Sequence, residues 1–241
     1  MKSKTLKNKI NDIVFVICAG GVLYLIVGFL MKTNWLSCPK PLPDLYEVVR
    51  DTLTLMAYFL APAIALVLFS DWRQEHVEKS REQQGKAIYN LVLQINSLLG
   101  ELEREIEEES NFSTDVSPIV EDLSKELIKK LSNIQHELSD FDYEDSEAKE
   151  FRVAVEAIIK DFRGNYYLLS RKFTVLVKQH NPSKYNHEYL NEDNEDFIAR
   201  QEGLYEEYNN EYIEGFGRIH SQLEDLKSLH NALKVKKQSP N

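Results

Sequence analysis

The chain of 241 residues carries a formal net charge of −10, and its 28% charged residues and mean hydropathy of −0.40 are typical of a soluble protein. That average combines two parts, because apolar residues are concentrated in the first seventy positions and the rest is rich in acidic and amide side chains. The acidic balance argues against a nucleic-acid partner, since phosphate binding needs a clustered Lys/Arg surface. Only two cysteines are present, which excludes a disulfide framework.

Two uncharged apolar segments near the N-terminus predict transmembrane helices. Residues 13–31 and 52–70 each contain nineteen positions without a charged side chain, close to the ~20 residues that a helix needs to cross a bilayer core. Lysines precede the first segment and Arg/Lys residues follow the second, and together they outweigh the cations of the intervening loop. Because cations favour the cytoplasmic side, the sequence predicts a two-span hairpin with both chain termini in the cytoplasm.

Aromatic and small residues agree with a membrane hairpin. Trp35 and Trp72 lie just beyond the first and second spans, where amphipathic rings sit at the level of the lipid headgroups. Pro62 removes a helix hydrogen bond in the middle of the second span and predicts a kink. Small residues that let membrane helices approach closely are expected to pack either within one hairpin or between chains: Gly21, Gly28, Ala57, Ala61 and Ala65.

Alternative interpretations of the membrane segment are less well supported. A cleaved signal would explain the basic residues before the first span and Cys38 after it, but the apolar run exceeds the roughly 7–15 residues of a signal core and Lys32 interrupts it before the cysteine. Cys38 is interpreted as an unpaired thiol, with a cross-link between two copies as the alternative. No ionisable residue lies inside either span, which argues against a proton relay or an ion-coupled transporter.

Residues 73–241 predict a helical cytoplasmic domain, distinct from the membrane domain of residues 1–72. The second span is expected to continue as a helical stalk, and three further amphipathic helices follow it. Ser117 before Pro118 matches an N-cap followed by proline at the first helical position, and Asn181 before a proline predicts the end of the next helix. We therefore predict an all-α fold with an antiparallel helical bundle of coiled-coil character.

No constellation of residues predicts catalysis, a cofactor or a metal site. His187 begins a sequence like that of a zinc protease, but Asn191 stands where the second histidine is required. Alternating polar residues from Asn191 have the spacing of a calcium loop, but Asp196 replaces the required glycine, so a helix-capping acidic loop is preferred. A stripe of tyrosines on the last helix is interpreted as a core or interface face: Tyr205, Tyr208 and Tyr212.

The segment from Leu60 to Glu75 resembles the end of the second span in uncharacterised bacterial two-span proteins. The residues that carry this resemblance are Pro62, Phe69, Asp71, Trp72, Arg73 and Gln74. Proteins of this layout occur among the membrane effectors of bacterial antiphage defence systems, including retron-linked ones. The resemblance implies action at the inner membrane, and it supplies no catalytic residue.

The leading hypothesis is therefore a non-enzymatic inner-membrane effector of an antiphage or abortive-infection system. Its cytosolic helical domain would receive a signal or partner, and its clustered hairpins would perturb the membrane. The alternative is a membrane-tethered scaffold or regulatory subunit that binds a cytosolic protein, and a membrane-bound enzyme is the least favoured class. The expected partners are the lipid bilayer, further copies of the chain and a cytosolic protein, with no nucleic acid.

Overall fold

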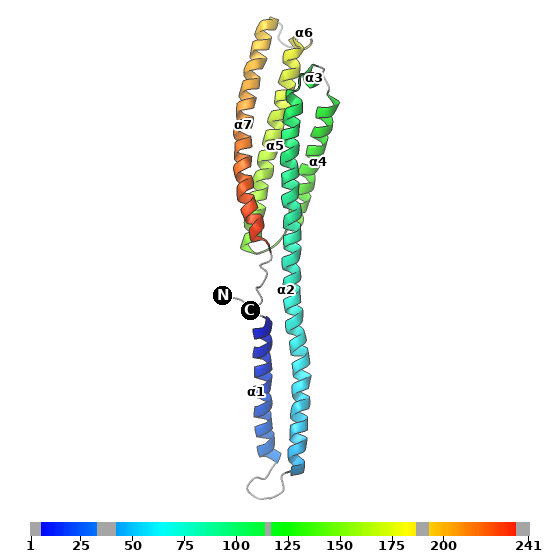
Figure 1. Cartoon of the computed structure of the whole chain (residues 1–241), viewed down its shortest axis with the longest axis vertical. Coiled ribbons are helices and arrows are strands. Elements are labelled where there is room, and N and C mark those ends of the chain that lie inside the picture. The colour runs from blue at the N-terminus through cyan, green and yellow to red at the C-terminus, as the bar shows by residue number, and fades with distance from the viewer. Residues whose placement is uncertain (1–5, 33–41, 114–116, 187–192, 235–241) are drawn as a thin grey trace. The chain divides into compact units, whose positions relative to one another are not determined.

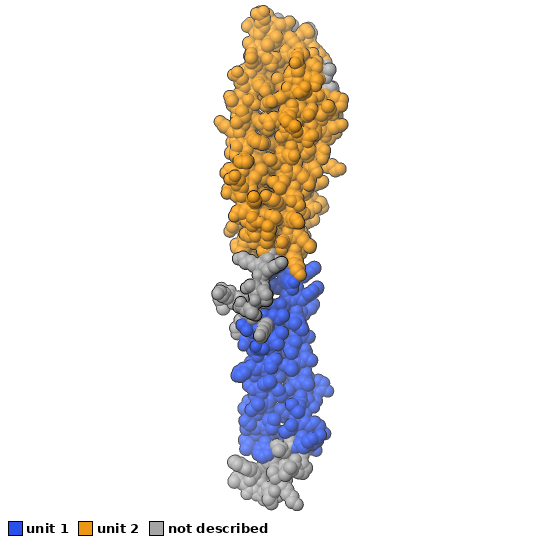
Figure 2. Space-filling model, in the orientation of Figure 1, with its two compact units in different colours: residues 1–78 blue, residues 79–241 orange. Residues whose placement is uncertain are grey.

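The computed structural model describes residues 6–32, 42–113, 117–186 and 193–234. This part of the chain is all-α, which confirms the predicted fold class. The helices are α1 (Leu6–Lys32), α2 (Leu42–Glu107), α3 (Glu109–Phe112), α4 (Pro118–Asp140), α5 (Ser146–His180), α6 (Pro182–Tyr185) and α7 (Asn194–Ala232) (Figure 1). The chain divides into two compact units, Met1–Glu78 and Lys79–Asn241, which Figure 2 shows in different colours.

Unit 1 consists of α1 and the first part of α2, which lie side by side in opposite directions. Gly21 in the middle of α1 packs against Met56 of α2. Near the start of α1, the Lys9 ammonium lies 3.6 Å from a carboxylate oxygen of Asp71, which is much later on α2. These two contacts fix an antiparallel register between the helices.

The surface of unit 1 is unusual for a water-soluble protein. Both α1 and α2 contain a segment that is long and apolar enough to cross a membrane, and few residues of either segment are buried. Large apolar side chains are instead exposed on both helices, among them Phe15, Leu23, Ile26, Leu53, Phe59, Leu66 and Phe69. In the part of α2 that belongs to unit 1, Val48 and Thr52 are buried.

Unit 2 is built around one hydrophobic core to which α2, α4, α5 and α7 all contribute. The buried positions alternate between spacings of three and four residues, which is the pattern that lets side chains of neighbouring helices interdigitate. On α2 these positions are Ile88, Val92, Ile95, Leu99, Leu102 and Ile106. On α5 they include Ala148, Phe151, Val155, Ile158, Phe162 and Leu169.

Three helices of unit 2 begin at capping side chains. Ser117 accepts a hydrogen bond from the backbone N–H of Val120 at the start of α4, which confirms the cap predicted at this position. Asp145 caps α5 in the same way. Asp193 caps α7 by accepting from the N–H of Asp196, as expected for a helix-capping acidic loop. Each such cap contributes about 1 kcal/mol by satisfying an otherwise unpaired N–H.

The helix ends agree in part with the sequence prediction. The helix α5 ends at His180, directly before Asn181, as predicted. The polar segment that follows α2 contains the short helix α3. Asn111 of α3 is buried, and its amide group donates to the backbone oxygen of Glu105 at 2.8 Å and accepts from Ser117 at 2.7 Å. This side-chain bridge holds the connection between α2 and α4 in place.

Two glycines of α7 provide a matched test of helix packing. A Cβ atom added at Gly215 would collide with the side-chain oxygen of Asn165 on α5, whereas one added at Gly217 would meet no atom within 4 Å. We predict that Gly215→Ala lowers the free energy of unfolding by about 1–3 kcal/mol through overpacking. Gly217→Ala should raise it by up to ~1 kcal/mol, because alanine is the better helix former.

The measurement is chemical denaturation of the full-length protein in detergent, followed by circular dichroism. A shift of the same sign and size in both variants would contradict the close approach of α5 and α7 at Gly215.

Candidate functional site

The small residues predicted for helix packing in unit 1 fall into two sets, one between α1 and α2 and one on the exposed surface of α2. Gly21 is buried against Met56, and a Cβ atom added at Gly28 would lie 3.1 Å from a methyl group of Val48. Gly21 and Gly28 of α1 therefore face α2 of the same chain. They account for the close contact within the hairpin.

The alanines of α2 are not part of that contact. Ala57, Ala61 and Ala65 are all exposed in the structure, although they follow one another at intervals of four residues. We call these three residues the alanine row. The structure places it on a face of α2 that α1 does not cover, so the row is available to a helix from outside the chain.

The remaining residues predicted for the membrane segment lie as follows. Pro62 is exposed and lies within α2, which is a single helix from Leu42 to Glu107. The exposed Trp72 ring stacks on His76, with ring centroids 5.5 Å apart. Trp35 and Cys38 lie outside the described residues.

A buried charged group in unit 2 was not predicted from the sequence. Lys172 of α5 has no exposed side-chain surface. Its ammonium group donates to the side-chain oxygen of Asn209 at 2.7 Å and to a carboxylate oxygen of Glu107 at 3.0 Å. It also lies 5.3 Å and 5.2 Å from the ring centroids of Tyr205 and Tyr212, within the range of cation–π attraction.

The two tyrosines connect this lysine to a second carboxylate. The Tyr212 hydroxyl donates to Glu103 at 2.9 Å, and the Tyr205 hydroxyl donates to Glu107 at 3.4 Å. Burial, together with Glu103, raises the pKa of Tyr212 well above its ordinary range, and burial together with Glu107 raises the pKa of Tyr205. Both hydroxyls therefore stay protonated and act as donors at neutral pH. We call this set the Lys172 cluster: Glu103, Glu107, Lys172, Tyr205, Asn209 and Tyr212.

The Lys172 cluster joins three helices of unit 2. Glu103 and Glu107 come from α2, Lys172 from α5, and the other members from α7. A buried ammonium that lost these partners would be strongly unfavourable. The cluster therefore favours one register of α7 against α5 and α2. Lys172 itself continues the three- and four-residue spacing of the α5 core after Leu169, and this is the signal by which the sequence could have identified it.

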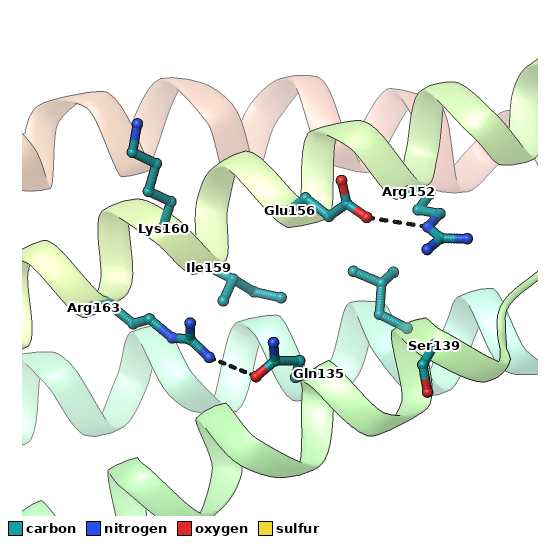
Figure 3. A pocket seen from close by; sticks show the side chains of 8 residues that line it. Gln135, Ser139, Arg152, Glu156, Ile159, Lys160 and Arg163 are labelled. Carbon is teal, nitrogen blue, oxygen red and sulfur yellow. Dashed lines mark hydrogen bonds and ion pairs between the residues drawn. The ribbon is translucent and has the colours of Figure 1, made fainter.

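A groove of about 420 Å³ lies between α4 and α5. Leu138 and Ile159 give it an apolar lining. Figure 3 shows that its arginines are engaged by neighbouring side chains: the Arg163 guanidinium donates to Gln135 at 2.7 Å, and that of Arg152 donates to Glu156 at 3.1 Å. The contact between Arg163 and Gln135 joins α5 to α4, whereas the contact between Arg152 and Glu156 lies within α5.

No group of three or more His, Cys, Asp or Glu side chains is arranged to hold a metal ion within the described ranges of the chain. His187, the first residue of the zinc-protease-like sequence, lies outside those ranges. Comparisons with protein-family models, with curated proteins and with solved structures find no match to this chain.

The Lys172 cluster predicts a local effect of mutation. Lys172→Ala should weaken the attachment of α7 by about 2–3 kcal/mol, because it leaves a cavity and removes the partner of Glu107 and Asn209. Hydrogen exchange of the α7 amides should then accelerate by roughly 30- to 150-fold. Lys172→Met, which keeps most of the side-chain volume, should show a smaller effect.

The matched control is Lys160→Ala, which removes an exposed lysine from the same helix. Hydrogen exchange followed by mass spectrometry on the full-length protein separates α7 from the other helices. Equal protection of α7 in the Lys172 and Lys160 variants would show that the cluster does not hold this helix.

Proposed function

We propose that the chain is an inner-membrane protein whose α1 and first part of α2 form a transmembrane hairpin. The observation that carries this proposal is the exposed apolar surface of unit 1. Removing a Leu or Phe side chain from water is worth about 1.5–3 kcal/mol. A helix pair that exposes many such side chains is therefore expected to insert into lipid, where its internally hydrogen-bonded backbone is also tolerated.

The cation distribution supports a cytoplasmic location for both chain termini. Lys9 lies before the first apolar segment, and Arg73, Lys79 and Arg81 follow the second. Under the proposed topology these cations lie on the cytoplasmic side. Unit 2 then forms an antiparallel helical bundle in the cytoplasm, where its own hydrophobic core makes it independent of lipid.

Within the membrane, the proposed function is that of a non-enzymatic effector. The exposed alanine row supports self-association of hairpins, because small residues allow backbones of neighbouring membrane helices to approach closely. Clustered hairpins would perturb the inner membrane after unit 2 receives a signal or partner. The resemblance of Leu60–Glu75 to two-span effectors suggests antiphage defence by growth arrest as the setting.

A membrane-tethered scaffold is the second candidate, and a different observation favours it. Ile119 and Ile128 of α4 are about half exposed on unit 2, and exposed apolar residues of this kind can contribute to a binding surface for a cytosolic protein. The two functions differ in the bilayer. Induced expression of an effector should cause dye entry and loss of membrane potential, whereas a scaffold should leave both intact and co-purify with its partner.

The proposed topology is tested by cysteine labelling in intact cells. A thiol reagent that cannot cross the membrane should label Cys38 in the outer loop, because this residue faces the periplasm. It should leave Ser110→Cys, introduced into α3 of unit 2 in a Cys38→Ser background, unlabelled until the cells are opened. Labelling of Ser110→Cys in intact cells, with Cys38 protected in the unmodified chain, would reverse the assignment of sides.

The alanine row is tested by adding bulk. Ala61→Leu combined with Ala65→Leu should separate packed hairpins and reduce toxicity, while insertion persists because leucine is at least as favourable in lipid as alanine. Leu66→Ala, on another exposed position of the same span, is the matched control. Growth after induction and chemical cross-linking are the measurements. Unchanged toxicity and cross-linking in the double variant would make the hairpin an anchor and favour the scaffold.

A further inference from the structure

The groove between α4 and α5 has an apolar middle and polar ends. Leu138 and Ile159 belong to the hydrophobic core of unit 2 and also line the middle of the groove. Figure 3 shows Arg163 reaching Gln135 at one end, and Arg152 lies toward the other end. The two arginines are eleven residues apart on α5, which corresponds to about 16 Å of helix. The groove volume of about 420 Å³ lies within the range of small-molecule sites, roughly 300–1,000 Å³.

The two arginines of the groove differ in how their charges are neutralised. The Arg152 guanidinium lies 3.1 Å from a carboxylate oxygen of Glu156 and 3.9 Å from one of Asp142. Arg163 has the neutral Gln135 as its hydrogen-bond partner, and among the described residues it forms no ion pair. The same holds for the ion pairing of Lys160, an exposed residue that also lines the groove. In a chain of net charge −10, one end of this groove therefore carries positive charge.

The chemistry of the groove selects an anion that also has an apolar part. A guanidinium group presents five N–H donors in a fork that matches a carboxylate or a phosphate, and Gln135 engages one of those of Arg163. An inorganic anion would gain only an exposed charge interaction, which water and salt weaken. An organic anion would in addition cover the apolar surface of Leu138 and Ile159.

We propose that this groove binds a small organic anion, a carboxylate or phosphate ester with a slender apolar body. Its acidic group lies at Arg163, and its body lies over Leu138 and Ile159. A ligand at Arg163 competes with Gln135, whose contact joins α5 to α4. Occupation of the groove is thereby coupled to the packing of α4 on α5. Binding itself needs only unit 2, whereas the role of this ligand as the signal that unit 2 receives rests on the proposed effector function.

Ligand-observed NMR by saturation transfer, on the full-length chain in lipid nanodiscs, tests the binding. The probes are 2-naphthoate and 1-naphthyl phosphate, and 2-naphthamide is the neutral analogue. We expect at least one of the anions to bind about tenfold or more tightly than the amide, and the stronger of the two separates a carboxylate from a phosphate preference. Inorganic phosphate at the same concentration should not displace it. Binding by neither anion, or equal binding by the amide, would overturn the proposal.

Substitutions at exposed positions of the groove locate the bound probe. Arg163→Gln should weaken binding of the anion by about tenfold or more, because it removes a charged hydrogen-bond donor. Ser139→Trp should block the groove with bulk, since Ser139 lines it from α4. The matched control is Arg171→Gln, which removes an exposed arginine from the same helix outside the groove. Equal affinity in all three variants and the unmodified chain would place the probe elsewhere and contradict the site.

The binding test is separate from that of the effector function. If the groove receives the signal, Ser139→Trp should reduce toxicity after induction. Retained toxicity in this variant, with probe binding lost, would overturn only the signalling role of the groove. Probe binding by a chain that causes neither dye entry nor loss of membrane potential would support the site and overturn only the effector.

Discussion

The apolar side chains of α1 and of the first part of α2 are expected to avoid water, and the proposed membrane location of unit 1 follows from this constraint. A pair of helices has too little contact area to bury large side chains on all of their faces, and the contact at Gly21 and Met56 uses only one side of α1. Under the proposed membrane location, a bilayer supplies the missing apolar surroundings and also requires that backbone groups be satisfied within each segment, which α-helices achieve. Unit 2 meets the opposite requirement. It buries its apolar residues in a shared core and, apart from Lys172, leaves the charged side chains of its described residues outside that core.

A buried charged group of unit 2 also favours one arrangement of its helices. The Lys172 cluster favours one register of α7 against α5, because a shift of one turn would separate the lysine from Asn209 and bury its charge without a partner. That same register brings Asn165 of α5 against Gly215 of α7.

Several features were predictable because they depend on short stretches of sequence. Uncharged runs define the apolar segments, Ser117 before Pro118 marks the start of α4, and Asn181 marks the end of α5. Features that depend on which helices meet could not be predicted in this way. The spacing of Gly21, Gly28 and the alanine row does not show which face α1 covers. The partners of Lys172 are Glu107, which is 65 residues away in the sequence, and Asn209, which is 37 residues away. A charged side chain is usually found at the surface, whereas Lys172 lies at a position that continues the core spacing of α5.

The functional proposals depend on the proposed insertion of α1 and the first part of α2 into lipid. Alkaline carbonate washing of membranes from cells that make the full-length chain, followed by flotation on a density gradient, tests it most directly. Peripheral proteins are released by this treatment, whereas integral proteins remain with the lipid. We expect the chain to float with the lipid fraction, and a variant that lacks residues 1–78 to be released. Quantitative release of the full-length chain would contradict the central claim.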